Sequence, residues 1–347
     1  MQPLRVERHA PEWQIWAALG TVYLVWGSTY LAIRVMVATM PPLLGGGTRH
    51  VIAGLIIFGL LLARRGPAAL RLRRGEWLGA GLVGLALLLG GNGLVILGER
   101  DVPSALAALI VAVVPLCVVV LRRVFGERVA RGTFAGVIAG FAGVAILIVP
   151  KGISGQVSLI GMLMILGAAL SWSIGSYFSK RLELPHDPLA STGVQMLVGG
   201  AGLLIVGGLT GEMGLVRPER FSTESVTALV YLTLFGSVLA YTAYTWALQH
   251  ASVSRVSTYA YVNPIVAMVL GAALLGERID LTMFVGAAMI IVSVGMVIRT
   301  ESRSAQPTGA LEASPAASEE VIEEEQLEAA EAASVDEELA AEASHPA

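Results

Sequence analysis

Residues 26–34 read WGSTYLAIR and form the polar, aromatic end of a long apolar segment. A related stretch, WSIGSYFSK, begins at Trp172. The 146 residues that separate Trp26 from Trp172 also separate Arg34 from Lys180. An internal sequence repeat determines how the whole fold is built. We therefore treat the chain as two repeats before assigning any single helix.

The composition around these two stretches is that of a membrane protein. Of the 347 residues, 55% are hydrophobic and 14% charged, and the mean hydropathy is +0.72, whereas soluble domains carry about 25% charged residues. Ten apolar segments, each about long enough to cross a bilayer as a helix, fall near residues 13–36, 42–63, 77–98, 103–121, 132–149, 158–179, 188–208, 225–248, 255–275 and 281–298. We therefore predict an all-α integral membrane protein with ten transmembrane helices.

The basic residues predict which side each loop faces, because Lys and Arg in short loops stay on the cytoplasmic side. With the N-terminus inside, sixteen basic residues fall on the cytoplasmic side and five on the other. An even number of helices returns the chain to the side where it began. Both termini are therefore predicted to be cytoplasmic.

The repeat divides the chain into four parts. Residues 1–12 precede the first segment, residues 13–150 and 155–299 hold five segments each, and residues 300–347 form an acidic tail. The tail has too few large apolar residues to offset the entropy of ordering, so it is predicted to be disordered. Five is an odd number, so the second repeat enters the membrane from the opposite face. Such inverted repeats are common in secondary transporters, which bind their substrates near the midplane between the repeats.

Several motifs in this order resemble a known family. They are WGSTYLAIR, Pro41-Pro42 with Arg49, Gly91-Asn92-Gly93 with Glu99, Val102-Pro103-Ser104, and the run from Tyr259 to Pro264. Over residues 14–299 the chain resembles the EamA-type transporters of the drug/metabolite transporter superfamily, and within them the YedA-like branch. The resemblance implies an inner-membrane carrier with ten helices and a central cavity, often for export of amino acids, other metabolites or toxic compounds. The expected partners are the bilayer and a small solute, with no nucleic acid, and the oligomeric state stays open.

Three polar residues in or beside apolar segments are candidates for chemistry. A charge such as Arg49 costs about 2.5 to 3.5 kcal/mol at a helix centre, so Arg49 either contacts an anion or carboxylate in a cavity or extends its stem to the outer headgroups. Asn92 serves either a substrate or a neighbouring helix. Glu99 is the candidate for proton coupling, because protonation changes its preference between wet and dry surroundings. The alternative is an interfacial acid paired with Arg100 or Arg49.

Aromatic side chains concentrate at the repeated stretches and in the second repeat. Residues three or four apart, such as Trp26 and Tyr30, share one face of a helix. An aromatic-lined pocket suits a small amphipathic or cationic solute, and membrane-interface belts or packing are the alternatives. The predicted substrate cavity comprises Trp26, Tyr30, Arg49, Asn92, Trp172, Tyr177, Tyr241, Tyr244, Tyr259 and Asn263.

Two prolines, Pro115 and Pro264, occupy equivalent positions in the fourth and ninth segments. Each removes one backbone hydrogen bond and bends a helix. They are interpreted either as gating kinks or as purely structural bends.

The predicted function is secondary transport by alternating access, with export of small metabolites or drugs and with protons as the candidate coupling ion. The chain has no GxxxxGK[ST] phosphate loop, so a gradient rather than ATP is expected to drive it. An uncoupled facilitator is the main alternative. An intramembrane enzyme is disfavoured, because no two acids lie together in an apolar segment and the histidines are scattered. No metal or cofactor is expected.

Overall fold

The computed structural model of the protein describes residues 11–127, 131–153, 157–251, 256 and 259–304. Most of the predicted N-terminal segment and the acidic tail from residue 305 onward lie outside the described residues. The chain separates into two units, 1–301 and 302–347, and the helical bundle belongs to the first. Within the described ranges the secondary structure is helical, without a β-strand.

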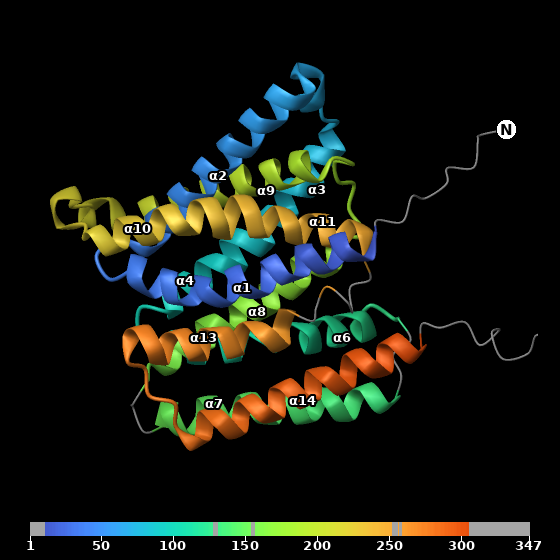
Figure 1. Ribbon diagram of the computed structural model, residues 1–347, viewed down its shortest axis with the longest axis vertical. Helices are drawn as coiled ribbons and strands as arrows, with labels where there is room; N and C mark the ends of the chain where they lie inside the picture. Colours follow the sequence, from blue (N-terminus) through green and yellow to red (C-terminus); the bar gives the residue numbers. More distant parts are fainter. Residues whose placement is uncertain (1–10, 128–130, 154–156, 252–255, 257–258, 305–347) are drawn as a thin grey trace, which may run out of the picture. The chain divides into compact units, whose positions relative to one another are not determined.

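Helix occupies each of the ten predicted segments (Figure 1). The helices of the first repeat are α1 (Glu12–Met36), α2 (Pro42–Arg65), α3 (Arg74–Gly84), η2 (Leu85–Asn92), α4 (Gly93–Gly98), α5 (Ser104–Val111), α6 (Val114–Val124) and α7 (Arg131–Ile153). Those of the second are α8 (Leu159–Phe178), α9 (Pro188–Leu209), α10 (Thr223–Tyr231), η5 (Leu232–Tyr241), α11 (Thr242–His250), α13 (Tyr259–Leu275) and α14 (Leu281–Ser304). Three short 3₁₀ turns lie in the connections: η1 (Pro67–Leu70), η3 (Glu212–Leu215) and η4 (Pro218–Arg220).

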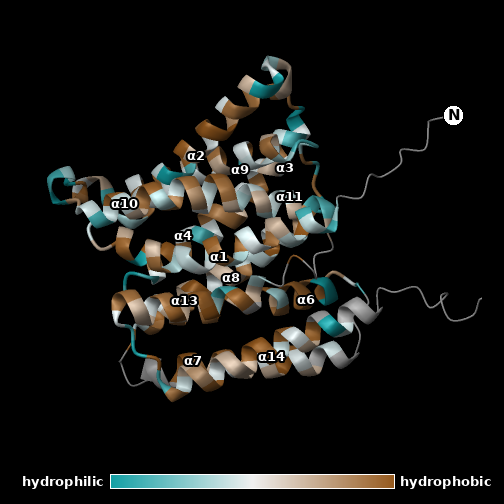
Figure 2. Ribbon diagram, viewed as in Figure 1, coloured by the Kyte–Doolittle hydropathy of each residue, from teal (hydrophilic) through white to brown (hydrophobic). Residues whose placement is uncertain are grey.

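Seven helical stretches among the described residues are long and apolar enough to cross a membrane. Shorter apolar stretches lie in α7 (Ala135–Val149), α13 (Val262–Leu275) and α14 (Leu281–Val297). Apolar residues run along the helices (Figure 2), and large ones remain on the outer surface, with Leu209 83% and Ile138 70% exposed. An apolar surface of this kind suits lipid as the solvent. A helical membrane protein is thus confirmed, and crossing by the three shorter stretches stays a prediction.

Local sequence explains where several helices begin and end. Ser158 and Asp187 cap α8 and α9, because their side-chain oxygens accept from the main-chain nitrogens of Gly161 (3.1 Å) and Leu189 (2.9 Å). At the end of α6, Gly126 adopts φ +83°, and at the end of α13 Gly276 adopts φ +65°. Glycine favours this left-handed conformation, which closes a helix. The two glycines therefore end the last helix turn at equivalent points of the two repeats.

Two wide, π-helical segments also occupy equivalent places. They are η2, which ends at Asn92, and η5, which ends at Tyr241. Such segments are rare and occur frequently at functional sites. Both end at a residue of the predicted cavity.

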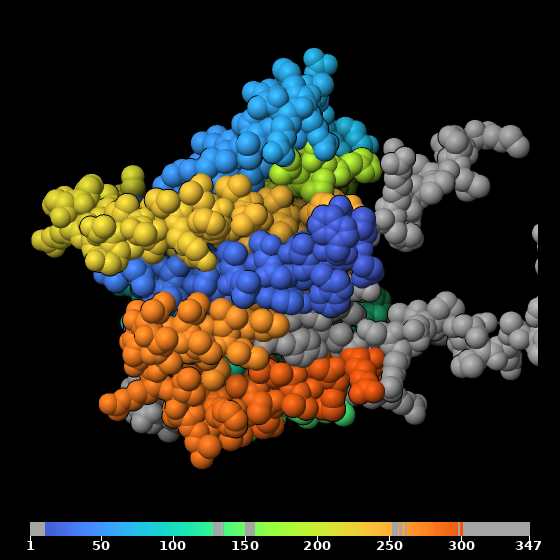
Figure 3. Space-filling model, viewed as in Figure 1, coloured from blue at the N-terminus to red at the C-terminus, as the bar shows by residue number. Residues whose placement is uncertain are grey.

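The repeats interleave rather than stand apart. Helix α2 of the first repeat packs closely against α9 of the second, and α1 contacts α13, η5, α10 and α11. Figure 3 shows α1 in dark blue between the yellow α10–α11 rod and the orange α13. Glycine allows α7 and α14 to approach closely, since a Cβ on Gly143 would lie 3.2 Å from the main-chain oxygen of Gly286 in α14. The centre of the bundle is therefore built from both repeats.

Substituting Gly84 by alanine is expected to lower the free energy of unfolding by about 1–3 kcal/mol, as overpacking does elsewhere. A Cβ at Gly84 would lie 2.5 Å from the main-chain oxygen of Gln195 and 2.7 Å from its Cα, and backbone cannot move aside cheaply. Gly59→Ala is the matched control, because nothing lies within 4 Å of a Cβ there. Thermal unfolding of the detergent-purified variants measures both. Equal stability of the two variants would contradict the contact.

Candidate functional site

The two repeated tryptophans meet at the centre of the bundle. The ring centroids of Trp26 in α1 and Trp172 in α8 are 5.4 Å apart, and the rings are nearly perpendicular. Tyr244 and Tyr259 lie 4.8 and 5.6 Å from Trp26 by the same measure, and Tyr241 lies at 6.2 Å. These separations are typical of favourable aromatic pairs. Trp26 is thus the hub of an aromatic cluster contributed by both repeats.

A cavity of about 70 Å³ adjoins this cluster. Eight of the ten predicted cavity residues line it: Trp26, Tyr30, Arg49, Asn92, Trp172, Tyr241, Tyr259 and Asn263. Since one ordered water needs about 10–15 Å³ by this measure, the cavity accommodates a few waters or one small polar group. The structure therefore brings together residues that are up to 237 positions apart in the sequence. Their role in substrate binding stays a prediction.

Arg49 is the charged group on this cavity. Its side chain is 3% exposed, and its Nε and Nη1 atoms find no hydrogen-bond partner among the described residues. Such burial does not support the alternative in which Arg49 reaches the headgroups at the membrane surface. Asn92 also faces the cavity, with its Oδ1 atom without a partner in the same part of the chain. Arg49 and Asn92 thus both line the cavity with polar atoms that have no partner among the described residues.

Gln195 occupies the position in the second repeat that matches Arg49 in the first. Its Oε1 atom accepts from the hydroxyl of Tyr241 at 2.6 Å, and its Nε2 donates to Ser191 Oγ at 3.0 Å. The equivalent position in the second repeat is therefore satisfied inside the protein.

Asn263 has a structural connection. When the amide nitrogen of Asn263 faces the main-chain oxygens of Tyr23 and Tyr259, it donates to them at 3.1 Å and 3.3 Å. It thereby links α13 to α1 while it lines the cavity. A packing role accounts for this amide without a substrate.

Glu99 is completely buried at the end of α4 and does not line the cavity. Neither carboxylate oxygen has a hydrogen-bond partner among the described residues. The charges that act on it are those of Arg34, Arg49 and Glu277. Arg34 donates instead to the main-chain oxygens of Glu99 and Arg100. The carboxylate therefore lies next to cavity residues without the ion pair of the alternative interpretation.

The family model of the EamA-like transporters matches residues 12–149 and, a second time, residues 159–299. This chain belongs to the EamA-like transporter family. The family resemblance inferred from the sequence motifs is thereby confirmed.

Known relatives agree with this assignment. The uncharacterized inner membrane transporter YedA of Escherichia coli strain K12 is 36% identical over 284 residues, which cover 82% of this chain and 90% of that protein. A probable amino-acid metabolite efflux pump of Salmonella typhimurium strain LT2 is 26% identical over 279 residues, covering 78% of this chain and 90% of its own. One crystal structure shares 20% identity and a TM-score of 0.60, covers 85% of this chain and 100% of its own, and supports the fold alone. Family and relatives indicate a membrane transporter rather than an enzyme.

The EamA-like transporter has a larger cavity, of about 720 Å³, at the side of the bundle where α1 begins. We call this the amino-terminal side. Lys180, His186, Gln195, Tyr244 and His250 are among the residues that line it. The hydrogen bond between Tyr241 and Gln195 joins a lining residue of the small cavity to one of the large cavity. The partition between the two cavities is therefore a few side chains thick, with Tyr244 among them.

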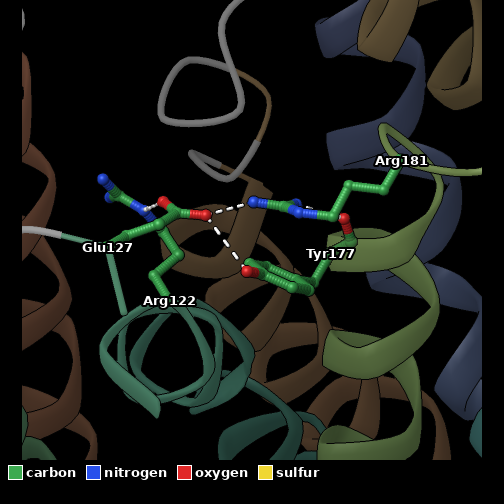
Figure 4. Close-up of polar contacts among 4 residues, drawn as sticks. All are labelled: Arg122, Glu127, Tyr177 and Arg181. Atoms are coloured by element: carbon green, nitrogen blue, oxygen red, sulfur yellow. Dashed lines mark hydrogen bonds and ion pairs between the residues drawn. The ribbon is translucent and has the colours of Figure 1, made fainter. Parts of the chain in front are cut away.

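Tyr177 does not belong to the central cavity, and its assignment there is corrected. Figure 4 shows it in an ion cluster on the amino-terminal side, with Arg122, Glu127 and Arg181. Arg122 Nε donates to Glu127 Oε2 at 2.7 Å, the Tyr177 hydroxyl donates to Glu127 Oε1 at 3.1 Å, and Arg181 pairs with the same carboxylate. The guanidinium carbon of Arg181 lies 3.6 Å from the centroid of the Tyr177 ring. This cluster joins the end of α6 to the end of α8.

Glu277 is the counterpart of Glu127, because each follows the glycine that ends a helix at equivalent points of the repeats. It accepts from the main-chain nitrogen and the hydroxyl of Ser104, both at 2.8 Å, and from the nitrogen of Ala105 at 3.1 Å. These bonds cap α5, since the first N–H groups of a helix lack partners within it. Glu127 and Glu277 thus connect neighbouring helices at opposite ends of the bundle.

The two prolines have different outcomes. Pro264 lies inside the continuous helix α13. Pro115 lies in the first turn of α6, and a turn at residues 112–113 separates α6 from α5, with both residues still in the right-handed helical region. A proline is tolerated in a first turn, where its missing N–H has no intrahelical partner in any case. A short interruption between α5 and α6 thus lies just before Pro115, and the gating or structural bend at each proline stays a prediction.

His50 and Ser237 are among the residues on the cavity that were not selected from the sequence. His50 is 1% exposed, and its Nδ1 atom lies 3.3 Å from Ser237 Oγ. His50 could have been found, because an ionisable residue inside an apolar segment is a functional candidate by default. Ser237 carried no such signal, as serines are common in membrane helices.

Replacing Glu127 by glutamine is expected to leave the pH dependence of transport unchanged. The hydrogen bond from Arg122 holds the pKa of the Glu127 carboxyl below its ordinary value of 4.5, against the opposing effect of partial burial, and the bond from Tyr177 adds to the lowering. A carboxyl group whose pKa is lower in the folded protein than in the unfolded chain stabilises the fold. This stabilisation is fully present above the ordinary pKa and is lost as the pH falls through the pKa of the folded state. The cluster therefore keeps its charges between pH 5 and 8.

Glu127→Gln should cost less than about 1 kcal/mol at pH 7, as solvent-screened ion pairs do. The difference from wild type should shrink as the pH falls from 4.5 through the lowered pKa of Glu127. Thermal unfolding against pH measures the stability, and solute flux against pH measures the function. A shifted flux profile would show that the cluster, and not a buried group, senses pH.

Proposed function

We propose that this EamA-like transporter is a secondary carrier that exports small metabolites, such as amino acids and related compounds, or drugs across the plasma membrane by alternating access. The membrane region would consist of two inverted repeats, 13–150 and 155–299, with ten crossings. Residues 1–12 and 300–347 would both be cytoplasmic.

The central cavity between the repeats carries this proposal. It is lined from both repeats, and a thin partition separates it from the larger cavity on the amino-terminal side. On the opposite side, Glu277 holds Ser104, and Arg34 holds the main chain at Glu99. With cytoplasmic termini, this arrangement corresponds to a carrier closed toward the outside and nearly open toward the cytoplasm. Rocking of the repeats around a midplane site would exchange the two states.

The relatives support export of metabolites. The Salmonella protein is named a probable amino-acid metabolite efflux pump, and the Escherichia coli protein an inner membrane transporter. The same fold serves many solutes, so the cargo has to be argued from the site itself.

Protons are the proposed coupling ion, with Glu99 as the group that carries them. A completely buried carboxylate without a hydrogen-bond partner is costly when charged and marks a proton pathway in membrane proteins. Its electrostatic neighbours Tyr30 and Arg49 line the cavity. Glu99 would therefore exchange a proton in step with the occupation of the cavity. A facilitator of the same fold would move solute without protons.

Liposomes with the purified protein and an internal pH dye test the function. They are challenged in turn with amino acids, organic acids and organic cations, and both solute and proton movement are recorded. Solute flux accompanied by proton movement supports a coupled carrier. Solute flux without proton movement supports the facilitator, and a complete lack of solute flux from folded protein contradicts transport of these classes.

A further inference from the structure

We propose that Arg49 binds a carboxylate of the transported solute, so that this protein selects small organic acids and amino acids with an apolar or aromatic body. The inference rests on the proposed transport function and names its substrate class. It starts from a buried guanidinium on the central cavity whose Nε and Nη1 atoms have no partner among the described residues.

A buried polar group without a partner is costly, and for a charged group the cost is larger still. Arg49 is 3% exposed, so water at the protein surface does not solvate it. Glu99 acts on it electrostatically but forms no hydrogen bond with it in the described structure. The Nε and Nη1 donors of the guanidinium are therefore available to a group that enters the cavity.

The second repeat supplies an internal reference. Gln195, at the position equivalent to Arg49, has both ends of its amide bonded, to Tyr241 and Ser191. A purely structural role at this place in the fold is thus performed by a neutral amide with internal partners. Arg49 differs in carrying a charge and in lacking such partners, and the difference points to a ligand.

The guanidinium selects the chemistry of that ligand. Its planar fork of N–H donors matches the two oxygens of a carboxylate, with which it forms paired, charge-assisted bonds. The cavity of about 70 Å³ has room for such a group and the carbons next to it. The surrounding rings of Trp26, Trp172, Tyr241 and Tyr259 favour an apolar or aromatic body. A larger body would extend past Tyr244 into the cavity of about 720 Å³.

The experiment uses two pairs of compounds that differ in a carboxylate against an uncharged carboxamide: phenylpropionate with phenylpropionamide, and L-phenylalanine with L-phenylalaninamide. Flux of each is measured in proteoliposomes, and equilibrium binding is measured to the full chain in nanodiscs. The variants are Arg49→Gln, which installs the residue found at position 195, and Arg49→Lys. Arg217→Gln is the matched control, because Arg217 is exposed and does not line the cavity.

The wild type and Arg217→Gln are expected to bind and move at least one of the acids tenfold or more better than its amide. Arg49→Gln, checked for folding by thermal unfolding and gel filtration, should lose this discrimination, and Arg49→Lys should retain part of it because the charge remains. Discrimination that survives in folded Arg49→Gln, or wild-type protein that binds neither acid better than its amide, overturns the inference. Binding with the expected discrimination but without flux leaves the carboxylate site standing and contradicts only the transport function.

Discussion

Proton-driven accumulation of solute is expected to fall at least tenfold in Glu99→Gln. The carboxylate is completely buried, lacks a hydrogen-bond partner in the described structure and lies in the fields of Arg34, Arg49 and Glu277. An amide of the same shape cannot take up or release a proton. Downhill exchange of solute should survive, because Glu99 does not line the cavity. Uptake and counterflow in proteoliposomes, with and without an imposed pH gradient, separate these two quantities.

Glu212→Gln is the matched control for this variant. Glu212 is also a buried acid, but it caps α2 by accepting from the main-chain nitrogens of Leu43 at 3.2 Å and Leu44 at 2.9 Å. Its replacement should weaken the helix start, by about 1 kcal/mol as helix caps typically do, and leave coupling intact. Full coupling in Glu99→Gln would show that another group carries the proton.

Trp26→Ala is expected to have the largest effect on both stability and transport. The indole contacts four other aromatic rings, and its Nε1 atom donates to the main-chain oxygen of Gly236 at 3.2 Å. Removing a fully buried tryptophan typically costs about 3–5 kcal/mol, and Trp26 is partly buried at the cavity, so its loss should lie near the lower end. It would also remove one wall of the cavity and a contact between the two repeats. Thermal unfolding in detergent and flux per folded protein are the measurements.

Two further variants separate packing from the polar contact. Trp26→Phe keeps an aromatic ring but loses the N–H, so its loss of stability should be clearly smaller. Trp13→Ala removes a tryptophan of the same helix that is 69% exposed, and it should change the free energy of unfolding by no more than about 0.5 kcal/mol. Similar losses in Trp13→Ala and Trp26→Ala would mean that the aromatic cluster is not central to the fold.

The positions of the helices followed from the sequence because apolar length is a strong signal in a membrane protein. The meeting of Trp26 with Trp172 followed from the repeat, since equivalent residues of inverted repeats approach each other near the midplane. Pattern matching failed for Tyr177, five residues after Trp172. At 3.6 residues per turn, five positions rotate a side chain by about 140°, away from the face that Trp172 shares with the cavity. Tyr30, four residues after Trp26, stays on the cavity face.

Several structural features could not be predicted from the local sequence. The π-helical segments depend on how backbone and neighbouring helices fit together, and neither η2 nor η5 carries a side-chain pattern that distinguishes it from an ordinary apolar helix. The interruption before Pro115 depends on tertiary context in the same way. The missing partners of Arg49 and Glu99 also require the complete structure, because a sequence shows which groups are charged but not which of them meet.

Each π-helical segment accepts a hydrogen bond from a neighbouring helix, and substitution can remove the donor of that bond but not its acceptor. In each of them a main-chain oxygen accepts from a side chain of a neighbouring helix: Ala86 from Ser171 Oγ at 2.8 Å, and Gly236 from Trp26 Nε1 at 3.2 Å. Every amino acid has a main-chain carbonyl, so sequence change at positions 86 and 236 cannot delete the acceptor. Only the donor can be lost. Selection for these two cross-links therefore acts on Trp26 and Ser171, while the segments that receive them can drift within the limits that packing sets.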